Sequence, residues 1–283
     1  MAPGGNGRRA GHLPAVLGKL GWPGLTGLAI LVAWVVAGAA IDLVSPYDPL
    51  HIVARRLQAP SGAHWLGTDA LGRDVLVRTI HGLRHSLPVA LVVVAFGVAI
   101  GSALGAIAGY AGGIVDGVVM RAVDITLSFP PVLLAMAVAA GLGPSLQNAA
   151  IAMIVVVWPL YARLMRAQVL AVREREHVEA AVAAGAPPAR ILFRHILPLC
   201  WSPALINATM DIGQVILLTA SLSFIGLGAT PPTPEWGQMI AEGAVNFYQW
   251  WVALGPGLAI LTIVLAFNFL GDGIRDLLDP RSR

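Results

Sequence analysis

Charged side chains are scarce in this sequence. Only 12% of its 283 residues are Asp, Glu, Lys or Arg, whereas 57% are hydrophobic and the mean hydropathy is +0.76. A soluble domain usually carries about 25% charged residues. A globular core of this length could not bury so much apolar surface behind so few charges, so the composition predicts a protein that lies in lipid.

Cysteine and lysine are almost missing, which excludes several classes of site. The single cysteine, Cys200, can form neither an intramolecular disulfide nor a cysteine metal cluster. A phosphate-binding Walker loop needs G-K-[ST], but the only lysine, Lys19, is followed by Leu20, so this chain is not itself an ATPase. The H-E-x-x-H, C-x-x-C and G-x-S-x-G patterns of hydrolases and redox proteins do not occur either. We therefore expect no catalytic residue, no metal site and no cofactor on this chain.

The net charge of +3 does not indicate nucleic acid, because the arginines lie mostly at the edges of apolar segments.

Six apolar segments are long enough to cross a hydrocarbon core of about 30 Å as helices. Backbone polar groups in lipid must be satisfied within each segment, and no alternating pattern indicates a barrel. The sequence thus predicts an all-α polytopic membrane protein with about six transmembrane helices. The first segment could be a signal peptide, but its length favours a retained helix. The segments cover residues 24–44, 86–110, 122–142, 148–167, 203–226 and 248–269.

The distribution of basic residues predicts the orientation. Lys and Arg occur in the N-terminal arm 1–23, in the loop 172–198 and in the C-terminal tail 271–283, all of which we expect to be cytoplasmic. Residues 45–85 must then be external, although they also carry several arginines. The remaining part, 86–270, would be a core with five transmembrane helices that includes the loop.

The expected external segment contains an amphipathic stretch at residues 71–87. At 100° per residue, its apolar side chains fall on one half of a helix, and polar ones such as Arg73 and Arg78 fall on the other. We predict a helix in the membrane interface with its guanidinium groups among the headgroups. His81 and His85 have the i,i+4 spacing of some metal sites, but no carboxylate accompanies them in the usual motif. This favours the interfacial polar face over a metal site.

Gly101, Gly105 and Gly109 form two overlapping G-x-x-x-G spacings in the second apolar segment. This spacing permits close contact between membrane helices, although such helices are also rich in glycine without any contact. The sequence leaves both interpretations open.

The loop 172–198 has the pattern of two helices joined by a turn. An alanine-rich helix is expected to end at Gly185, which suits a left-handed cap, and the prolines 187–188 can begin the second helix. That helix would expose the apolar run 191–193 to the cytoplasm. Exposed apolar side chains away from the membrane indicate a partner protein.

The same loop resembles the E-A-A…G…L-P loop of ABC importer permeases. Glu179-Ala180-Ala181, then Gly185 and Leu197-Pro198, match that pattern. In this family the loop is the coupling helix, which docks on an ATPase subunit. The resemblance implies the coupling role for Glu179, Ala180, Ala181, Gly185, Arg190, Phe193, Leu197 and Pro198.

Three further stretches resemble the dipeptide/oligopeptide/nickel branch, in particular its second permease subunit. Many relatives carry a glutamate just before Ser221, whereas this sequence has Leu218 and Thr219 there, which puts a substrate contact through such an acid in doubt. The stretches are Leu66-Gly67-Thr68-Asp69 with Gly72-Arg73-Asp74, the run 221–237 and the run 271–281.

The resemblance implies a type I ABC importer permease in a bacterial cell membrane, with both termini cytoplasmic. It implies a heterodimer with a second permease subunit, two ATPase subunits that bind ATP and Mg, and an external solute-binding protein. Dipeptides or oligopeptides are the expected substrates, with nickel or another metal chelate, glutathione and haem as alternatives. From other classes, an ion-driven secondary transporter and a membrane scaffold stay open. The internal repeats that are common in secondary transporters are not visible here.

A polar stripe runs along the fifth apolar segment. Ionisable groups inside a span are costly, and Asp211 lies well inside this one. The stripe either makes hydrogen bonds between neighbouring helices or lines a translocation path at the interface with the second permease. Asp124, three residues from Arg121, is expected to form an interfacial ion pair instead. The stripe follows i, i+4, i+7 and i+14 and consists of Asn207, Asp211, Gln214 and Ser221.

Overall fold

The described part of the chain is built from helices that are joined by turns and loops. The computed structural model describes residues 20–278, so most of the arm 1–23 and the end of the tail 271–283 lie outside it. Within residues 20–278 there is no β-strand, which confirms the all-α prediction for this part. The elements are α2 (Gly21–Val44), α3 (Val75–Ala111), α4 (Gly113–Leu127), α5 (Pro131–Leu142), α6 (Leu146–Arg173), α7 (Glu176–Ala183), α8 (Pro188–Arg190), the π-helix η1 (Ile191–Ile196), α9 (Leu197–Phe224), α10 (Trp236–Val245) and α11 (Trp251–Leu278).

Five stretches of helix are long and apolar enough to cross a membrane: α2, α3, α6, α8–η1–α9 and α11. A sixth crossing results if α4 and α5 are counted as one span. This agrees with the prediction of about six transmembrane helices. The prediction of one uninterrupted helix over 122–142 is wrong, because α4 and α5 meet at an angle of 93°. Pro130 and Pro131 explain the break, since proline lacks a backbone N–H and disfavours the helical conformation in the preceding residue.

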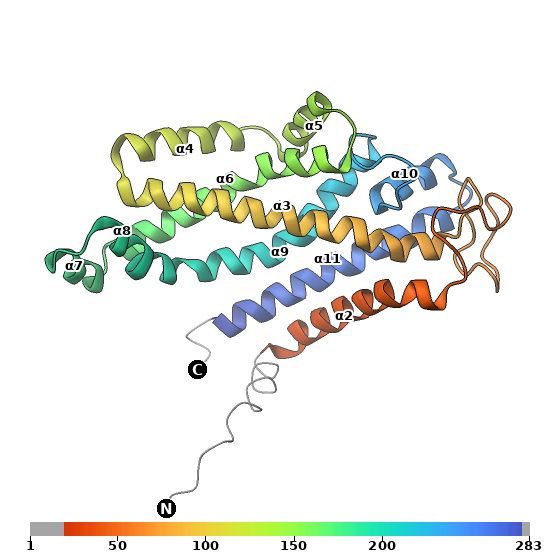
Figure 1. Ribbon diagram of the computed structural model, residues 1–283, viewed down its shortest axis with the longest axis horizontal. Helices are drawn as coiled ribbons and strands as arrows, with labels where there is room; N and C mark the ends of the chain where they lie inside the picture. The colour runs from red at the N-terminus through yellow and green to blue at the C-terminus, as the bar shows by residue number, and fades with distance from the viewer. Residues whose placement is uncertain (1–19, 279–283) are drawn as a thin grey trace, which may run out of the picture.

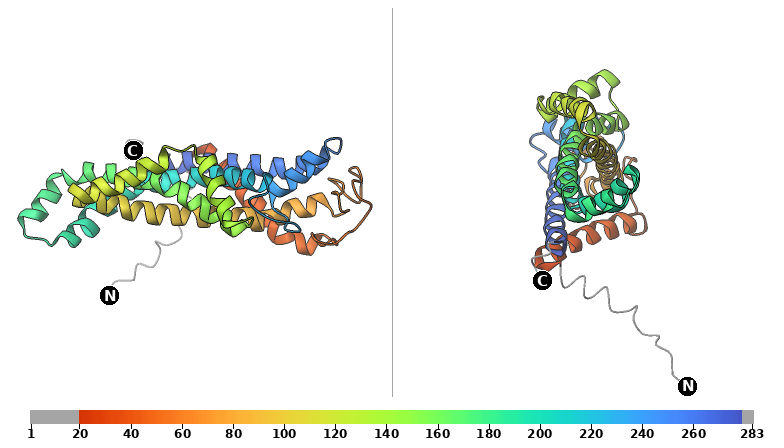
Figure 2. Two further views of the ribbon diagram at one scale, coloured as in Figure 1. Left: turned by 90° about the horizontal axis from the view of Figure 1, so that it is seen from above. Right: turned by 90° about the vertical axis from the view of Figure 1, so that its left-hand side faces the viewer.

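The helices form an elongated bundle whose two ends differ. α7 and the described ends of α2 and α11 lie toward one end, and residues 45–74 and α10 lie at the other (Figure 1, Figure 2). The described ends of α2 and α11 thus lie toward the same end of the bundle, which is the arrangement that six crossings produce.

α3 and α6 make the most extensive helix contact in the bundle. A methyl group at Gly101 or Gly105 would overlap the backbone of α6, at the carbonyl oxygens of Trp158 and Ala162 respectively. Of the two interpretations of the G-x-x-x-G spacing, close helix contact is therefore confirmed. Small residues let two backbones approach closely, so van der Waals contact between the helices is extensive.

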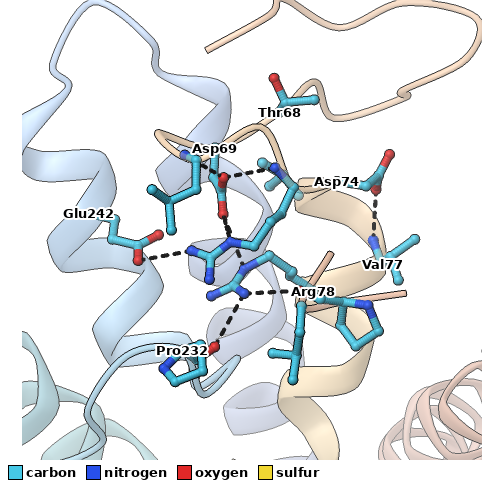
Figure 3. Close-up of polar contacts among 12 residues, drawn as sticks. Thr68, Asp69, Asp74, Val77, Arg78, Pro232 and Glu242 are labelled. Carbon is cyan, nitrogen blue, oxygen red and sulfur yellow. Dashed lines mark hydrogen bonds and ion pairs between the residues drawn. The ribbon is translucent and has the colours of Figure 1, made fainter. Parts of the chain in front are cut away.

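Residues 45–74 and α10 form a folded unit that we call the distal lobe, and the side chain of Arg78 makes polar contacts with it and with Pro232 (Figure 3). Arg73 and Arg78 are 1% and 0% exposed. Asp69 Oδ2 lies 2.6 Å from Nε of Arg73 and 3.4 Å from Nε of Arg78. Arg73 also approaches Glu242 of α10, with 3.3 Å between Nη2 and Oε1. The two carboxylates offset the buried positive charge. Without these carboxylates, the buried arginines would strongly destabilise the fold.

The prediction of an interfacial helix over 71–87 with guanidinium groups among the headgroups is therefore wrong. The helix begins at Val75, is capped by the side chain of Asp74, and continues without interruption as α3. A helical wheel identifies a polar face, but it cannot tell whether that face meets water or the acids of a distant segment. His81 likewise contacts Asp42 of α2, with 2.9 Å between Nε2 and Oδ1. Among the described residues, no group of three potential metal ligands occurs.

Replacing Gly105 by alanine is expected to lower the stability of the protein. The new methyl group would overlap the carbonyl oxygen of Ala162, so α3 and α6 would have to separate. Overpacking of this kind costs about 1–3 kcal/mol. Gly257→Ala in α11 is the matched control, because nothing lies within 4 Å of its added methyl group. Thermal unfolding in detergent should show a lower Tm for Gly105→Ala alone. Equal Tm values for the two variants would contradict the packing assignment.

Candidate functional site

α7 ends in the conformation that the sequence predicts. Gly185 has a φ of +74°, in the left-handed region. Its N–H donates to the carbonyl of Val182 at 2.9 Å, and the N–H of Ala186 donates to the carbonyl of Ala181 at 3.1 Å. These are the two hydrogen bonds of a Schellman motif. The predicted cap at Gly185 is confirmed, and it fixes the direction in which the chain leaves α7.

The segment after this turn exposes fewer apolar side chains than expected. Ile191 and Leu192 are 3% and 9% exposed and pack into a small core between α6, α7 and the start of α9. The expectation that the whole run 191–193 is exposed is therefore wrong. Phe193 is 69% exposed and is the apolar side chain of this run that points outward. A sequence pattern could not separate these neighbours, because the π-helix η1 changes the angular spacing of successive side chains.

The loop presents a mixed polar and apolar surface at its end of the bundle. Of the residues that the resemblance assigns to coupling, Ala181 and Leu197 are partly buried. The others are exposed: Glu179, Ala180, Gly185, Arg190, Phe193 and Pro198. Beside them, a groove of about 640 Å³ lies between α7 and the end of α3, and its lining includes Tyr110, Arg173, Glu179, Val182 and Ile191. Such a surface suits a protein partner better than it suits lipid.

The predicted polar stripe lies on α9, and its members have different surroundings. The carboxylate of Asp211 is partly buried and accepts a hydrogen bond from the hydroxyl of Tyr161 on α6, at 2.6 Å. Gln214 is exposed and Asn207 is partly buried. Ser221 donates to a carbonyl of its own helix at 2.8 Å. The stripe therefore combines one contact between helices with side chains that are open to the surface.

Asp211 and Gln214 share a small cavity of about 170 Å³ where α6 and α9 meet the junction of α4 and α5. Asn207 and Ser221 do not line it, so the structure brings together two of the four predicted residues. The remaining lining is apolar and comprises Leu127, Pro131, Val156, Val157, Leu160, Val215 and Leu218. A carboxylate and an amide in apolar surroundings can orient a polar solute or water by hydrogen bonds.

Two ion pairs between α4 and α6 add polar groups that the sequence did not assign. Arg163 Nη2 lies 2.8 Å from Asp124 Oδ1, and Arg166 Nη2 lies 2.6 Å from Asp116 Oδ2. The expected pairing of Asp124 with Arg121 is wrong, because the acid contacts α6 instead. The partners are 39 and 50 residues apart, so no local spacing identifies them.

Comparison with known proteins identifies the family. Residues 101–283 match the family described as "Binding-protein-dependent transport system inner membrane component", which is more than half of the chain. The chain belongs to this family. It is 48% identical over 266 residues to the dipeptide transport system permease protein DppC of Escherichia coli (strain K12), covering 91% of this chain and 88% of that protein. It is 43% identical over 263 residues to DppC of Alkalihalophilus pseudofirmus, covering 92% and 86%. It is also 43% identical over 258 residues to the glutathione transport system permease protein GsiD of Pectobacterium atrosepticum, covering 90% and 85%.

A solved structure has the same fold as this inner membrane component. The match is to a chain of the MetNI methionine ABC transporter in an inward-facing conformation, with a TM-score of 0.59 and 24% identity. It covers 72% of this chain and 97% of that one. The predicted type I importer permease fold is confirmed, and the relatives confirm the resemblance to the dipeptide/oligopeptide branch.

Gly185→Val is expected to weaken the coupling of transport to ATP hydrolysis, because it would disturb the loop that is predicted to dock on an ATPase subunit. A β-branched residue in the left-handed region costs about 1–2 kcal/mol, which lowers the ratio of capped to uncapped loop by about 5- to 30-fold. Gly143→Val is the matched control, because Gly143 also has positive φ (+90°) in open surroundings but lies at the turn between α5 and α6. In the assembled transporter, only Gly185→Val should lower substrate-stimulated ATP hydrolysis. Wild-type stimulation in this variant would rule out the coupling assignment.

Two conservative substitutions separate the alternatives for Asp211. Asp211→Asn removes the charge and keeps the shape, whereas Tyr161→Phe removes only the hydrogen bond between α6 and α9. If the acid lines the path, Asp211→Asn should alter the rate or selectivity of uptake, and Tyr161→Phe should transport almost normally. If the hydrogen bond between helices is the whole role, Tyr161→Phe should lose about 0.5–1.5 kcal/mol of stability, whereas Asp211→Asn should lose less, because its amide oxygen still accepts from Tyr161; neither should change selectivity. Uptake and Tm, measured on both assembled complexes, decide between the two.

Proposed function

We propose that this chain is a transmembrane permease subunit of an ATP-driven importer of dipeptides or oligopeptides. The observation that carries the proposal is the 48% identity to a dipeptide transport system permease over 91% of the chain. The capped loop with exposed Glu179, Arg190 and Phe193 supports it, because it offers a docking surface beyond the ends of the spanning helices.

In this proposal the chain performs no chemistry of its own. Two partner ATPase subunits bind ATP and Mg and hydrolyse the nucleotide, and α7 docks on one of them. An external solute-binding protein delivers the peptide. A second permease subunit completes a heterodimer, and the path runs between the two permeases along the side of α9 that carries Asp211 and Gln214.

The arginines support an orientation in a bacterial cell membrane. The loop 172–198 and the last turns of α11 carry basic residues at one end of the bundle, and basic residues favour the cytoplasmic side. Both termini would then be cytoplasmic, and the distal lobe would be external. Two of the arginines at that end, Arg73 and Arg78, do not oppose this orientation, because Asp69 and Glu242 offset their charge, whereas Arg55 and Arg56 are exposed there.

Glutathione is a second candidate substrate within the same chemical class. The observation that favours it is the 43% identity to a glutathione transport system permease. Glutathione is itself a small peptide, so one path could serve either solute. The solute-binding protein, which is another chain, would then decide between them.

Transport by the reconstituted complex tests the proposed function. Proteoliposomes that contain both permeases, the ATPase subunits and the binding protein should accumulate labelled dipeptide only when ATP is present. Uptake should survive a proton uncoupler, because no ion gradient drives it. Omission of the binding protein is the matched control and should abolish uptake. Uptake without ATP that the uncoupler abolishes would instead establish an ion-driven secondary transporter, and competition by unlabelled glutathione would identify the second candidate.

A further inference from the structure

The junction between α4 and α5 lies at the middle of the bundle. α4 ends at Leu127 and α5 begins at Pro131, and both residues line the cavity that contains Asp211. Asp211 is near the centre of α9, which has 28 residues. Val156 of the 28-residue α6 lines the same cavity. The break in the third span is therefore close to mid-depth in the membrane, and not at an interface.

The break leaves backbone groups unsatisfied. Pro130 and Pro131 have no N–H, and the N–H groups of Val132 and Leu133 find no acceptor within residues 20–278. Phe129 is 54% exposed, and Ser128 and Pro130 are exposed as well. Irregular backbone at membrane depth is tolerated only where protein or a water-filled space covers it. The break at residues 128–130 is therefore covered by protein or water and not by lipid.

An ion pair between α4 and α6 leads to the same conclusion. The side chains of Asp124 and Arg163 are 61% and 55% exposed, although Arg163 lies on a helix that is long enough to cross the membrane and Asp124 lies on the first part of the bent α4–α5 span. Asp124 precedes the break by one helical turn. Charged groups in a span almost always face the interior of a bundle or a water-filled space, because exposure to lipid is costly. Within this chain the pair has no such cover.

The opposite side of the bundle provides a contrast. α2 packs on α11 and α3, away from α4 and α5 (Figure 2). Its exposed side chains include Val32, Val35 and Val36, which are 51%, 55% and 58% exposed. These are the side chains that a lipid-facing helix carries. The bundle thus exposes apolar side chains on the side of α2 and charged side chains on the side of α4 and α6.

The geometry points to a contact surface for the second permease subunit, formed by Asp124, Arg163 and the break at residues 128–130, which we call the break surface. Large apolar side chains flank its polar groups, since Ile125 is 57% and Leu133 58% exposed. This mixture suits a packed protein interface better than a purely aqueous wall. Its depth excludes the ATPase subunits and the binding protein as occupants. The inference rests on the proposed function, because a second permease is part of it.

Photochemical cross-linking in the assembled transporter tests this surface. The photoreactive amino acid benzoylphenylalanine replaces Phe129 in one complex and Val36 in another; the two side chains are similarly exposed, at 54% and 58%. After irradiation in liposomes, mass spectrometry identifies the attached chain. We expect a product with the second permease from position 129 and none from position 36. If the complex with the change at 129 does not assemble, Ile125, one turn earlier on α4, takes its place.

Three results would overturn the inference: a product with a second copy of this chain, lipid adducts alone at both positions, or equal yields of the permease product from both. Peptide uptake by the unmodified complex is measured in the same preparation. Normal ATP-driven uptake without the expected product rejects the break surface and leaves the proposed function intact. Absence of uptake in the unmodified complex rejects the proposed function, whatever the cross-linking result.

Discussion

Lipid offers no hydrogen bonds to a polypeptide backbone, and this constraint decides where the chain can depart from a helix. The long irregular stretch 45–74 lies at one end of the bundle, where its own backbone bonds close it, as between Val53 N–H and the carbonyl of Gly72 at 2.9 Å. The turn at Gly185 lies at the other end and is closed by a Schellman motif. The break at 128–130 is the irregular segment near mid-depth, and for that reason it is the most informative one about partners.

The length of α3 links the two ends. Its 37 residues span about 55 Å at 1.5 Å per residue, whereas the hydrocarbon core is about 30 Å thick. Both ends of the helix must therefore project from the lipid. One end carries Arg78 into the distal lobe, and near the other Tyr110 lines the groove beside α7. Close packing of α3 on α6 at the glycines holds the two helices together. This packing therefore fixes the position of both projecting ends of α3, one in the distal lobe and one beside α7.

Features that depend on local sequence could be predicted, and features that depend on distant partners could not. The spans and the cap at Gly185 follow from runs and turns of neighbouring residues, and both are present. The polar face that includes Arg73 was identified, but its environment was not, because Glu242 is 169 residues away. The burial of Ile191 depends in the same way on a core contributed by other helices. The break at Pro130 is different. The two prolines that cause it are a local signal, but the segment is apolar throughout and was therefore interpreted as one continuous span.

The same distinction applies to the candidate site. The depth of Asp211 follows from the sequence, because a span has to be centred on its apolar run. Its partner does not, because only the packing of α6 against α9 brings Tyr161 to 2.6 Å. Both residues lie on helices that flank the loop 172–198, since α6 enters that loop and α9 leaves it. The two helices also meet the α4–α5 junction across the cavity that Asp211 shares with Leu127 and Pro131. In the proposed importer, the acid that is proposed to line the path is therefore beside the break, where the backbone is already unsatisfied within this chain.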